Sequence, residues 1–359
     1  MYNPLSTLEV QSKKIGENHP TYFIADIAAN HDGDLERAKD LICMAAEAGA
    51  DAAKFQHFQA ATIVSDHGFK SLNVQHSHQA NWKDSVFNVY KAASVNLDWT
   101  ETLKVTCEKA GITFFTTPYD LDIVDHMDDH VPAYKIGSGD ITWLEMIERV
   151  ASKQKPYFLA TGAATLDEVY RAVSAALLIN PQLALMQCNT NYTASLENFK
   201  YIHLNVLKTY RAMYPDIVLG LSDHTPGHST VLGAVALGAR MVEKHFTDDV
   251  SREGPDHAFS MDQRGWREMV ERTRELENAL GNGIKKVEDN EKETIVLQRR
   301  SLRARAALSK SHMIKVGDFV ALRPCPADAL TPVEIHSIIG RVIRRDIPVG
   351  DYLRAADLE

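Results

Sequence analysis

Residues 22–57 have the sequence YFIADIAANHDGDLERAKDLICMAAEAGADAAKFQH, which contains a complete strand–helix–strand unit. The apolar runs at 22–27 and 52–57 predict buried strands. Between them we expect a helix that begins near Asp34 and ends at Ala48 and Gly49, because Asp is a favoured N-cap residue and Gly a favoured C-cap residue. The face of this helix that would cover the strands carries Leu35, Ala38, Leu41, Ile42, Ala45 and Ala46.

The same unit recurs along the chain, with further strands predicted at 112–117, 133–137, 157–161, 183–188, 217–220 and 240–245. Capping boxes predict helix starts at Asp98, Thr142 and Thr165, each followed three residues later by Glu. A last helix is expected at 263–280. Eight such units in roughly 260 residues are typical of a (β/α)8 TIM barrel. A doubly wound open sheet is the alternative, but no G-x-G-x-x-G motif follows the first strand.

The composition excludes several classes of protein. The 359 residues are 45% hydrophobic and 24% charged, with a net charge of −9, which disfavours a disordered chain or a nucleic-acid-binding surface. The 4 cysteines form no C-x-x-C pair, so neither a disulfide framework nor a zinc cage is expected. The N-terminus has no apolar signal core and no long apolar run occurs, so we expect a cytoplasmic protein without membrane association.

Two segments interrupt the repeat. Residues 58–97 form a long polar insertion after the second strand, and loops of this length are uncommon unless they are functional. Residues 283–299 have the polar composition of a linker, and residues 300–359 change to short alternating segments broken by Gly and Pro. We therefore expect a barrel at 1–282, a linker at 283–299 and a small β-rich domain at 300–359.

Polar residues follow nearly every predicted barrel strand, where the active sites of such barrels lie. Polar residues that recur at the same end of so many strands indicate a functional site, because residues that only pack the core would be apolar. The clusters include Asp26, Asn30 and His31; Lys54 and Gln56; Thr116 and Thr117; Lys135 and Ser138; Thr161; Gln187, Asn189 and Tyr192; Ser222, Asp223 and His224; and Glu243, Lys244 and His245.

His224 and His245 end neighbouring strands, and two imidazoles with carboxylate or water suit a divalent cation such as Mn²⁺ or Zn²⁺. The alternative is that each is a hydrogen-bonded core or rim histidine.

The other candidate residues are weaker. His67, His76 and His78 fit solvated loop residues, and Asp256 with His257 could either form a turn or contact a substrate.

Lys54 and Lys135 lie inside apolar strands. A lysine that points into a barrel mouth is costly unless it meets an anion, whereas on an outer face it could extend to solvent. Because Gly137, Ser138 and Gly139 follow Lys135, we favour anion binding: glycines let backbone N–H groups approach a phosphate.

Eight segments resemble the sialic acid (nonulosonic acid) synthase family: FIADIAANHDGD, DAAKFQ, FFTTPYD, AYKIGSGD, LATGAATLDEV, LGLSDHTPGHS, ALGARMVEKHFT and GPDHAFSMD. The tail from RRSLRARAAL onward resembles that family's C-terminal antifreeze-like domain, a β-clip fold also called SAF. The resemblance covers roughly residues 20–359. It implies a metal-dependent condensation of phosphoenolpyruvate with an N-acetylmannosamine-type aldehyde, giving a nine-carbon 2-keto sugar acid and phosphate.

The resemblance also implies roles for residues. The metal, expected to be Mn²⁺ with Mg²⁺ or Co²⁺ as alternatives, would be held by His224 and His245. Matching positions assign phosphoenolpyruvate to Lys54, Thr117, Lys135 and Ser138, and the acceptor sugar to Gln56, Asn189 and Tyr192. Glu243 matches a catalytic carboxylate, and Asp26 and Lys54 are assigned to catalysis beside it. Arg323 matches an arginine that reaches the partner subunit's site in a domain-swapped homodimer.

The sequence departs from the family pattern at three positions. Asp26 stands where many members have Glu, Thr190 occupies the position of an Asn, and Cys325 replaces the Gly of an R-P-G motif. These departures bear on the acceptor sugar more than on the reaction type. The alternatives are a Schiff-base aldolase that uses Lys54 or Lys135, a barrel that condenses phosphoenolpyruvate with a phosphorylated sugar, and a non-catalytic sugar-binding homologue.

Overall fold

A computed structural model describes residues 3–72, 79 and 82–359. The chain forms two compact units, residues 1–281 and 282–359, and each is described by itself. Within the described residues, no helix has both the length and the apolar character that crossing a membrane requires.

The first unit is a closed barrel in which each strand is parallel to its neighbours. β10 pairs with β3, so the last barrel strand closes on the first. The predicted (β/α)8 fold is confirmed, and the strand boundaries differ from the predicted ones by three residues at most. The barrel strands are β3 (Tyr22–Asp26), β4 (Ala52–His57), β5 (Thr113–Pro118), β6 (Tyr134–Ile136), β7 (Tyr157–Ala160), β8 (Leu183–Cys188), β9 (Val218–Asp223) and β10 (Met241–His245).

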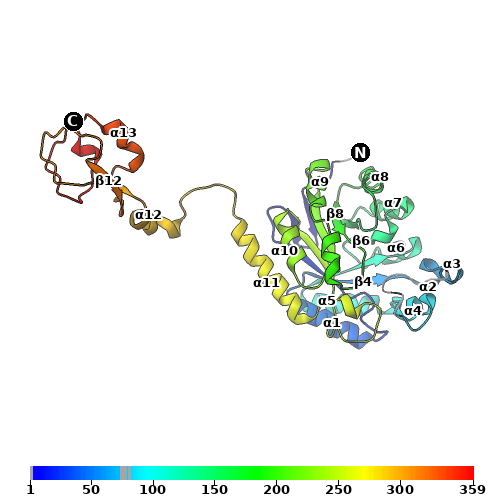
Figure 1. The fold of residues 1–359 in the computed structure, drawn as a ribbon. Helices are drawn as coiled ribbons and strands as arrows, with labels where there is room; N and C mark the ends of the chain where they lie inside the picture. The colour runs from blue at the N-terminus through cyan, green and yellow to red at the C-terminus, as the bar shows by residue number, and fades with distance from the viewer. Residues whose placement is uncertain (1–2, 73–78, 80–81) are drawn as a thin grey trace. The chain divides into compact units, whose positions relative to one another are not determined.

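Helices surround the strands (Figure 1). They are α1 (Leu35–Glu47), α5 (Thr100–Ala110), α6 (Leu121–Met127), α7 (Leu144–Ser152), α8 (Leu166–Leu177), α9 (Val206–Met213), α10 (Ser229–Ala236) and α11 (Gln263–Leu280).

Local signals predicted some helix starts correctly and others wrongly. Asp34 caps α1, and Thr165 forms its capping box at α8, as predicted. The boxes predicted at Asp98 and Thr142 are wrong. Asp98 lies in a short 3-10 turn capped by Asn96, and α7 begins after Trp143 without a side-chain cap. In both places the residue before the α-helix lies one position later than the motif requires: Trp99 precedes α5 and Trp143 precedes α7.

An N-terminal hairpin that the sequence reasoning missed pairs β1 (Thr7–Val10) with β2 (Lys13–Gly16). Its apolar side chains Leu8, Val10 and Ile15 are buried in the main core. Thr113, the first residue of β5, donates a hydrogen bond to Gln11 in the hairpin turn, 3.0 Å away. The hairpin therefore covers the amino-terminal ends of the strands, opposite the predicted site.

The insertion at 58–97 contains α2 (Ala60–Ile63), α3 (Asp66–Ser71) and α4 (Val86–Ala93). His67 lies exposed on α3, whereas His76 and His78 lie outside the described residues. α2 and α4 pack against each other, so part of the insertion is a helical layer beside the barrel.

The second unit has its own small core, which includes Leu302, Phe319 and Ile343. β11 (Ser301–Ala304) pairs antiparallel with β12 (Phe319–Leu322), and isolated bridges add further β-structure. The predicted linker is not wholly irregular, because α12 (Lys292–Gln298) lies within it.

His57 ends β4 and alternates with the inward residues Lys54 and Gln56, so it faces the helical layer. It is fully buried, its Nδ1 lies 2.7 Å from Thr116 Oγ1, and its Nε2 has no hydrogen-bond partner. Burial lowers the pKa of His57 from 6.5 to about 3. The folded chain therefore keeps this imidazole neutral at pH values where the unfolded chain protonates it.

We predict that His57→Phe makes stability less dependent on pH. Because the folded pKa is depressed, the parent loses stability as pH falls below 6.5, by about 2 kcal/mol from this group between pH 7.5 and 5. Urea unfolding at both pH values measures the difference. Thr116→Val removes the hydrogen-bond partner but keeps the imidazole, so it should retain the parent's pH dependence. An equal pH dependence in His57→Phe would contradict the prediction.

Candidate active site

One cavity at the carboxyl ends of the strands gathers most of the predicted site residues. It encloses about 340 Å³ and is called here the cationic cavity. Lys54 and Lys135 line it together with His224 and His245, so the four groups on which the metal and anion hypotheses depend share one mouth of the barrel. Side chains alternate along a strand, which explains why these residues face inward while their neighbours do not. Its other predicted members are Asp26, Gln56, Thr117, Ser138, Tyr192 and Glu243.

Lys54 is held by two side chains of the adjacent strands. Its ammonium donates to Asp26 Oδ2 at 2.7 Å and to Thr117 Oγ1 at 2.9 Å, and both Lys54 and Asp26 are almost completely buried. Gln56 donates to the same Asp26 oxygen at 2.9 Å. Burial alone would raise the pKa of Asp26, but the attraction of the Lys54 ammonium outweighs it and holds that pKa below its usual range.

Glu243 bridges the two lysines. Its Oε1 accepts a hydrogen bond from Lys135 at 3.2 Å, lies 3.9 Å from Lys54 Nζ, and accepts from Ser222 Oγ at 3.3 Å. Its other oxygen, Oε2, is buried without a hydrogen-bond partner. A buried carboxylate oxygen with unused acceptor capacity can hold water or a substrate hydroxyl.

The two histidines face each other with ring centroids 5.4 Å apart. His224 Nδ1 lies 2.9 Å from the backbone carbonyl of Asn189, a contact that orients the ring as in many metal-bound histidines. Burial lowers the pKa of His245 to about 3, which favours the neutral imidazole that binds metals. Burial opposes protonation of His224 as well, but hydrogen bonds with Cys188 and Asn189 raise its pKa.

The donor set around the histidines fits an open site rather than a closed cage. His245 Nε2 lies 3.6 Å from Asp26, its Nδ1 lies 3.8 Å from Asp256, and that nitrogen has no hydrogen-bond partner. Within the part of the chain that the structure describes, no three or more His, Cys, Asp or Glu side chains converge as a preformed metal cage. Two imidazoles would leave coordination positions for water and substrate oxygens.

Ser138 lies where the chain after β6 meets β7. Its Oγ accepts a hydrogen bond from the Gly162 N–H at 3.0 Å. A Cβ on Gly162 would lie 2.6 Å from the Thr190 methyl group, so only glycine fits there. Thr190, one of the departures from the family pattern, thus packs directly against the wall that holds Ser138.

The comparisons with known proteins identify the family. A profile described as the NeuB family matches residues 41–285. The chain belongs to this family of sialic acid and related nonulosonic acid synthases. The N,N'-diacetyllegionaminic acid synthase of Legionella pneumophila is 34% identical over 95% of both chains. The human N-acetylneuraminate-9-phosphate synthase is 28% identical over 98% of this chain and 96% of the human one.

Solved structures agree with the fold. The N-acetylneuraminic acid synthetase of Leptospira borgpetersenii, in complex with citrate, is 28% identical with a TM-score of 0.69 and covers 82% of this chain and 97% of its own. The spore coat polysaccharide biosynthesis protein SpsE of Bacillus subtilis has a TM-score of 0.65 at 29% identity, covering 98% of this chain and 99% of its own. The barrel fold of this NeuB family chain is therefore similar to the solved structures of its relatives.

Two predicted substrate residues are not brought to the cationic cavity by the barrel. The side chain of Asn189 donates to the Tyr201 carbonyl at 3.3 Å, and only its backbone carbonyl serves the site, through His224. Arg323 belongs to the second unit, where its Nε donates to the Gln298 carbonyl at 2.6 Å.

Sequence reasoning missed Tyr90, Tyr119 and Asp140, which also line the cationic cavity. Tyr119 and Asp140 each lie two residues beyond an assigned strand-end residue, so a wider window after each strand would have included them. Burial raises the pKa of Asp140 to about 6, and its Oδ2 has no hydrogen-bond partner. Tyr90 comes from α4 of the insertion and carries no local signal.

Several predicted strand-end residues face outward and have structural roles. Lys244, between Glu243 and His245, donates to Asp223 Oδ2 at 2.6 Å and to the Thr225 carbonyl at 2.6 Å, and it is fully buried. The Lys244 ammonium outweighs the effect of burial and holds the pKa of Asp223 below its usual range.

We predict that Lys244→Met destabilises the protein by about 3–5 kcal/mol, because it leaves the buried Asp223 carboxylate without its cation. Chemical denaturation measures the loss. Lys39→Met is the control: Lys39 pairs with the exposed Glu36 on the surface of α1, so its removal should leave the free energy of unfolding nearly unchanged. Equal stability of the two variants would show that the buried pair is not structural.

Proposed function

We propose that this protein condenses phosphoenolpyruvate with the open-chain aldehyde of an N-acetylmannosamine-type sugar, a 2-acetamido or 2,4-diacetamido hexose. The products are a nine-carbon 2-keto sugar acid of the sialic, legionaminic or pseudaminic type and inorganic phosphate. The observation that carries the proposal is the convergence of two buried lysines and two facing histidines in one cavity. Membership of the NeuB family supports it.

The cationic cavity suits phosphoenolpyruvate, which carries a phosphate and a carboxylate. Lys54 and Lys135 supply two ammonium groups, and Thr117 and Ser138 add hydroxyls beside them. Asp26 and Glu243 already offset the charge of the two lysines. Each ammonium has three N–H donors, so the phosphate and carboxylate oxygens of phosphoenolpyruvate would accept further charge-assisted hydrogen bonds from them. The two carboxylate-paired lysines also suit anion binding better than the Schiff-base alternative, which needs an uncharged amine.

We propose that His224 and His245 hold a divalent cation, Mn²⁺ first, with Mg²⁺ or Co²⁺ as alternatives. When bound, this cation would act as a Lewis acid that polarises the aldehyde oxygen of the acceptor. The neutral, partly unpartnered His245 imidazole and the backbone-oriented His224 ring fit such a role.

In the proposed reaction the C3 carbon of phosphoenolpyruvate forms a bond to the aldehyde carbon, and the aldehyde oxygen takes up a proton. Water then adds at C2, and the bond between C2 and the phosphate oxygen breaks to leave a ketone and release phosphate. Glu243, whose Oε2 has no protein partner, would orient this water. Asp26 would hold the Lys54 side chain in place beside the phosphoenolpyruvate.

We predict that His224→Ala or His245→Ala lowers Mn²⁺-stimulated phosphate release at least about 100-fold, because the Lewis acid supplies several kcal/mol and each 1.4 kcal/mol is about tenfold. Phosphate release from phosphoenolpyruvate with a panel of 2-acetamido hexoses measures activity, and Mn²⁺ electron paramagnetic resonance measures binding. Circular dichroism should show the parent's fold. His67→Ala, on exposed α3, is the control. Unchanged turnover and Mn²⁺ binding in both variants would remove the metal role.

We also propose a domain-swapped homodimer in which Arg323 of one subunit reaches the acceptor of the other. Arg323→Ala should then raise the KM for the sugar or lower kcat, because it deletes a charge-assisted contact. Mixed dimers give the decisive measurement. A subunit with His245→Ala and one with Arg323→Ala, each weakly active alone, should regain activity when they are refolded together, since one of the two sites is then intact. Arg344→Ala, an exposed arginine of the same unit, is the control. No recovery in the mixed dimers would exclude the swap.

A further inference from the structure

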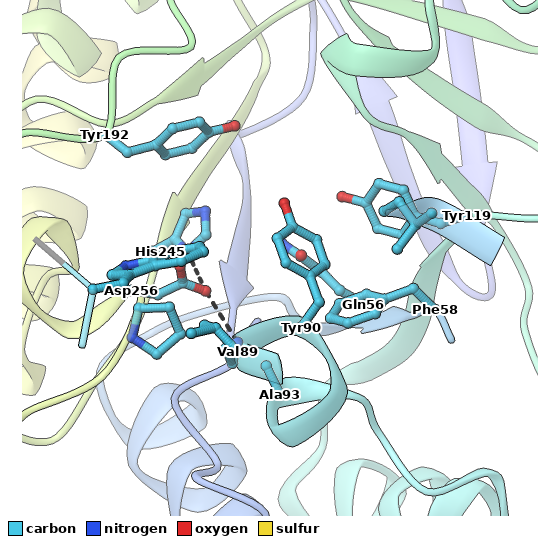
Figure 2. A pocket seen from close by; sticks show the side chains of 13 residues that line it. Gln56, Phe58, Val89, Tyr90, Ala93, Tyr119, Tyr192, His245 and Asp256 are labelled. Atoms are coloured by element: carbon cyan, nitrogen blue, oxygen red, sulfur yellow. Dashed lines mark hydrogen bonds and ion pairs between the residues drawn. The ribbon is translucent and has the colours of Figure 1, made fainter. Parts of the chain in front are cut away.

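A second space opens beside the cationic cavity. It encloses about 130 Å³ and is called here the aromatic chamber, because Phe58, Trp82, Tyr90, Tyr119 and Tyr192 line it. Figure 2 shows Tyr90, Tyr119 and Tyr192 around this space, with His245 and Asp256 on one side of it. The two spaces adjoin, because both are lined by Tyr90, Tyr119, Tyr192, Gln56, Ile63 and His245.

The two spaces differ in charge. Both lysines line the cationic cavity, and neither lines the aromatic chamber. Among the described residues that line the chamber, none is a lysine or arginine, and the one carboxylate is that of Asp256. The rest of the wall combines apolar side chains with the polar groups of Gln56, His245 and three tyrosines. About half of these residues come from the 58–97 insertion, including Val89 and Ala93 of α4.

The orientation of the acceptor follows from the proposed function, on which this inference rests. Phosphoenolpyruvate would occupy the end of the cationic cavity that holds Lys54 and Lys135, and the aldehyde carbon must meet it beside His224 and His245. The rest of the open-chain sugar must then extend away from the lysines. His245 and Tyr192 line both spaces. The distal carbons, up to C6, would therefore extend past these residues into the aromatic chamber.

We propose that the aromatic chamber restricts the acceptor to sugars without a phosphate, and that it favours an apolar group, such as the methyl of a 6-deoxy hexose, at the distal end. A phosphate on C6 would lie beside the half-buried Asp256 carboxylate with no cation among the described lining residues, and like charges at short range repel. A methyl group would instead replace water against Val89, Ala93 and the aromatic rings.

Asp256 is held in position by its surroundings. Its Oδ2 accepts a hydrogen bond from the Ala29 N–H at 3.1 Å, and its backbone carbonyl accepts one from Ser260 at 2.7 Å. The next residue, His257, is fully buried, with Thr247 Oγ1 2.7 Å from one ring nitrogen and Asp32 Oδ1 3.1 Å from the other. The carboxylate cannot easily turn away from a phosphate, but it can accept hydrogen bonds from sugar hydroxyls.

The first experiment compares matched acceptors. Phosphate release with phosphoenolpyruvate and Mn²⁺ should give a kcat/KM at least about 100-fold higher for N-acetylmannosamine or its 6-deoxy analogue than for N-acetylmannosamine 6-phosphate. Equal or better use of the 6-phosphate would overturn the inference and leave the proposed function intact. Release with none of the three, and none with a 2,4-diacetamido-6-deoxy hexose, would count against the proposed function.

A binding measurement without turnover tests the selectivity of the aromatic chamber separately from the proposed condensation. Calorimetry with the reduced sugars, which have no aldehyde, should show binding of the 6-deoxy alditol of N-acetylmannosamine and at least about tenfold weaker binding of the 6-phosphate alditol. Equal binding of the two, or binding of neither, would overturn the inference whatever the turnover shows.

A variant tests the chamber wall itself. Val89→Lys places a cation on α4 beside the chamber, so it should raise the ratio of kcat/KM for the 6-phosphate to that for the unphosphorylated sugar at least about tenfold. Val89→Met changes the size of this side chain without adding a charge, and it should leave the ratio unchanged. The ratio is insensitive to a general loss of folded protein. An unchanged ratio in Val89→Lys would contradict the role of the chamber.

Discussion

Two ammonium groups buried at one mouth of the barrel, those of Lys54 and Lys135, impose the constraint on which the rest of the site depends. An unpaired buried cation costs several kcal/mol, so each needs an anion within reach. Asp26 and Glu243 supply these anions from β3 and β10, the first and last strands of the closed barrel. Closure of the barrel and neutralisation of the site are thus the same structural event, because β10 must pair with β3 before all four groups can meet.

The pairing is incomplete in a way that leaves room for chemistry. Glu243 shares one oxygen between both lysines and Ser222, while its other oxygen has no partner. A site built only for stability would satisfy both oxygens. The Asp223–Lys244 pair, between β9 and β10, shows the contrast. It faces outward, and Thr225 and Thr230 also bond the Asp223 carboxylate. Side chains alternate along a strand, so Lys244 faces outward to Asp223 while its neighbour Glu243 faces the cavity.

The sequence predicted the barrel and most of the cationic cavity because both depend on strand periodicity. Buried strands appear as short apolar runs, and the polar residues at their ends share one rim once the sheet closes. The sequence did not predict the features that depend on tertiary packing. The start of α7 depends on packing around Trp143, the β1–β2 hairpin closes the opposite end of the barrel, and Tyr90 reaches the site only because α4 packs beside it. The Asn189 side chain bonds to the Tyr201 carbonyl and does not line the cationic cavity, because its direction depends on the fold of the loop after β8.

The three departures from the family pattern bear on whether this chain keeps the chemistry of its relatives. Asp26 is one methylene shorter than the usual Glu, yet it reaches Lys54 at 2.7 Å and lies 3.6 Å from His245, so the shorter carboxylate still serves both groups. Thr190 packs its methyl against Gly162. Cys325 is buried in the second unit, where its backbone N–H donates to the Val296 carbonyl at 2.8 Å. None of the three removes a charged group from the cationic cavity. A homologue that had lost catalysis would have no need to keep two costly buried lysines there, so their retention favours an enzyme over a sugar-binding protein.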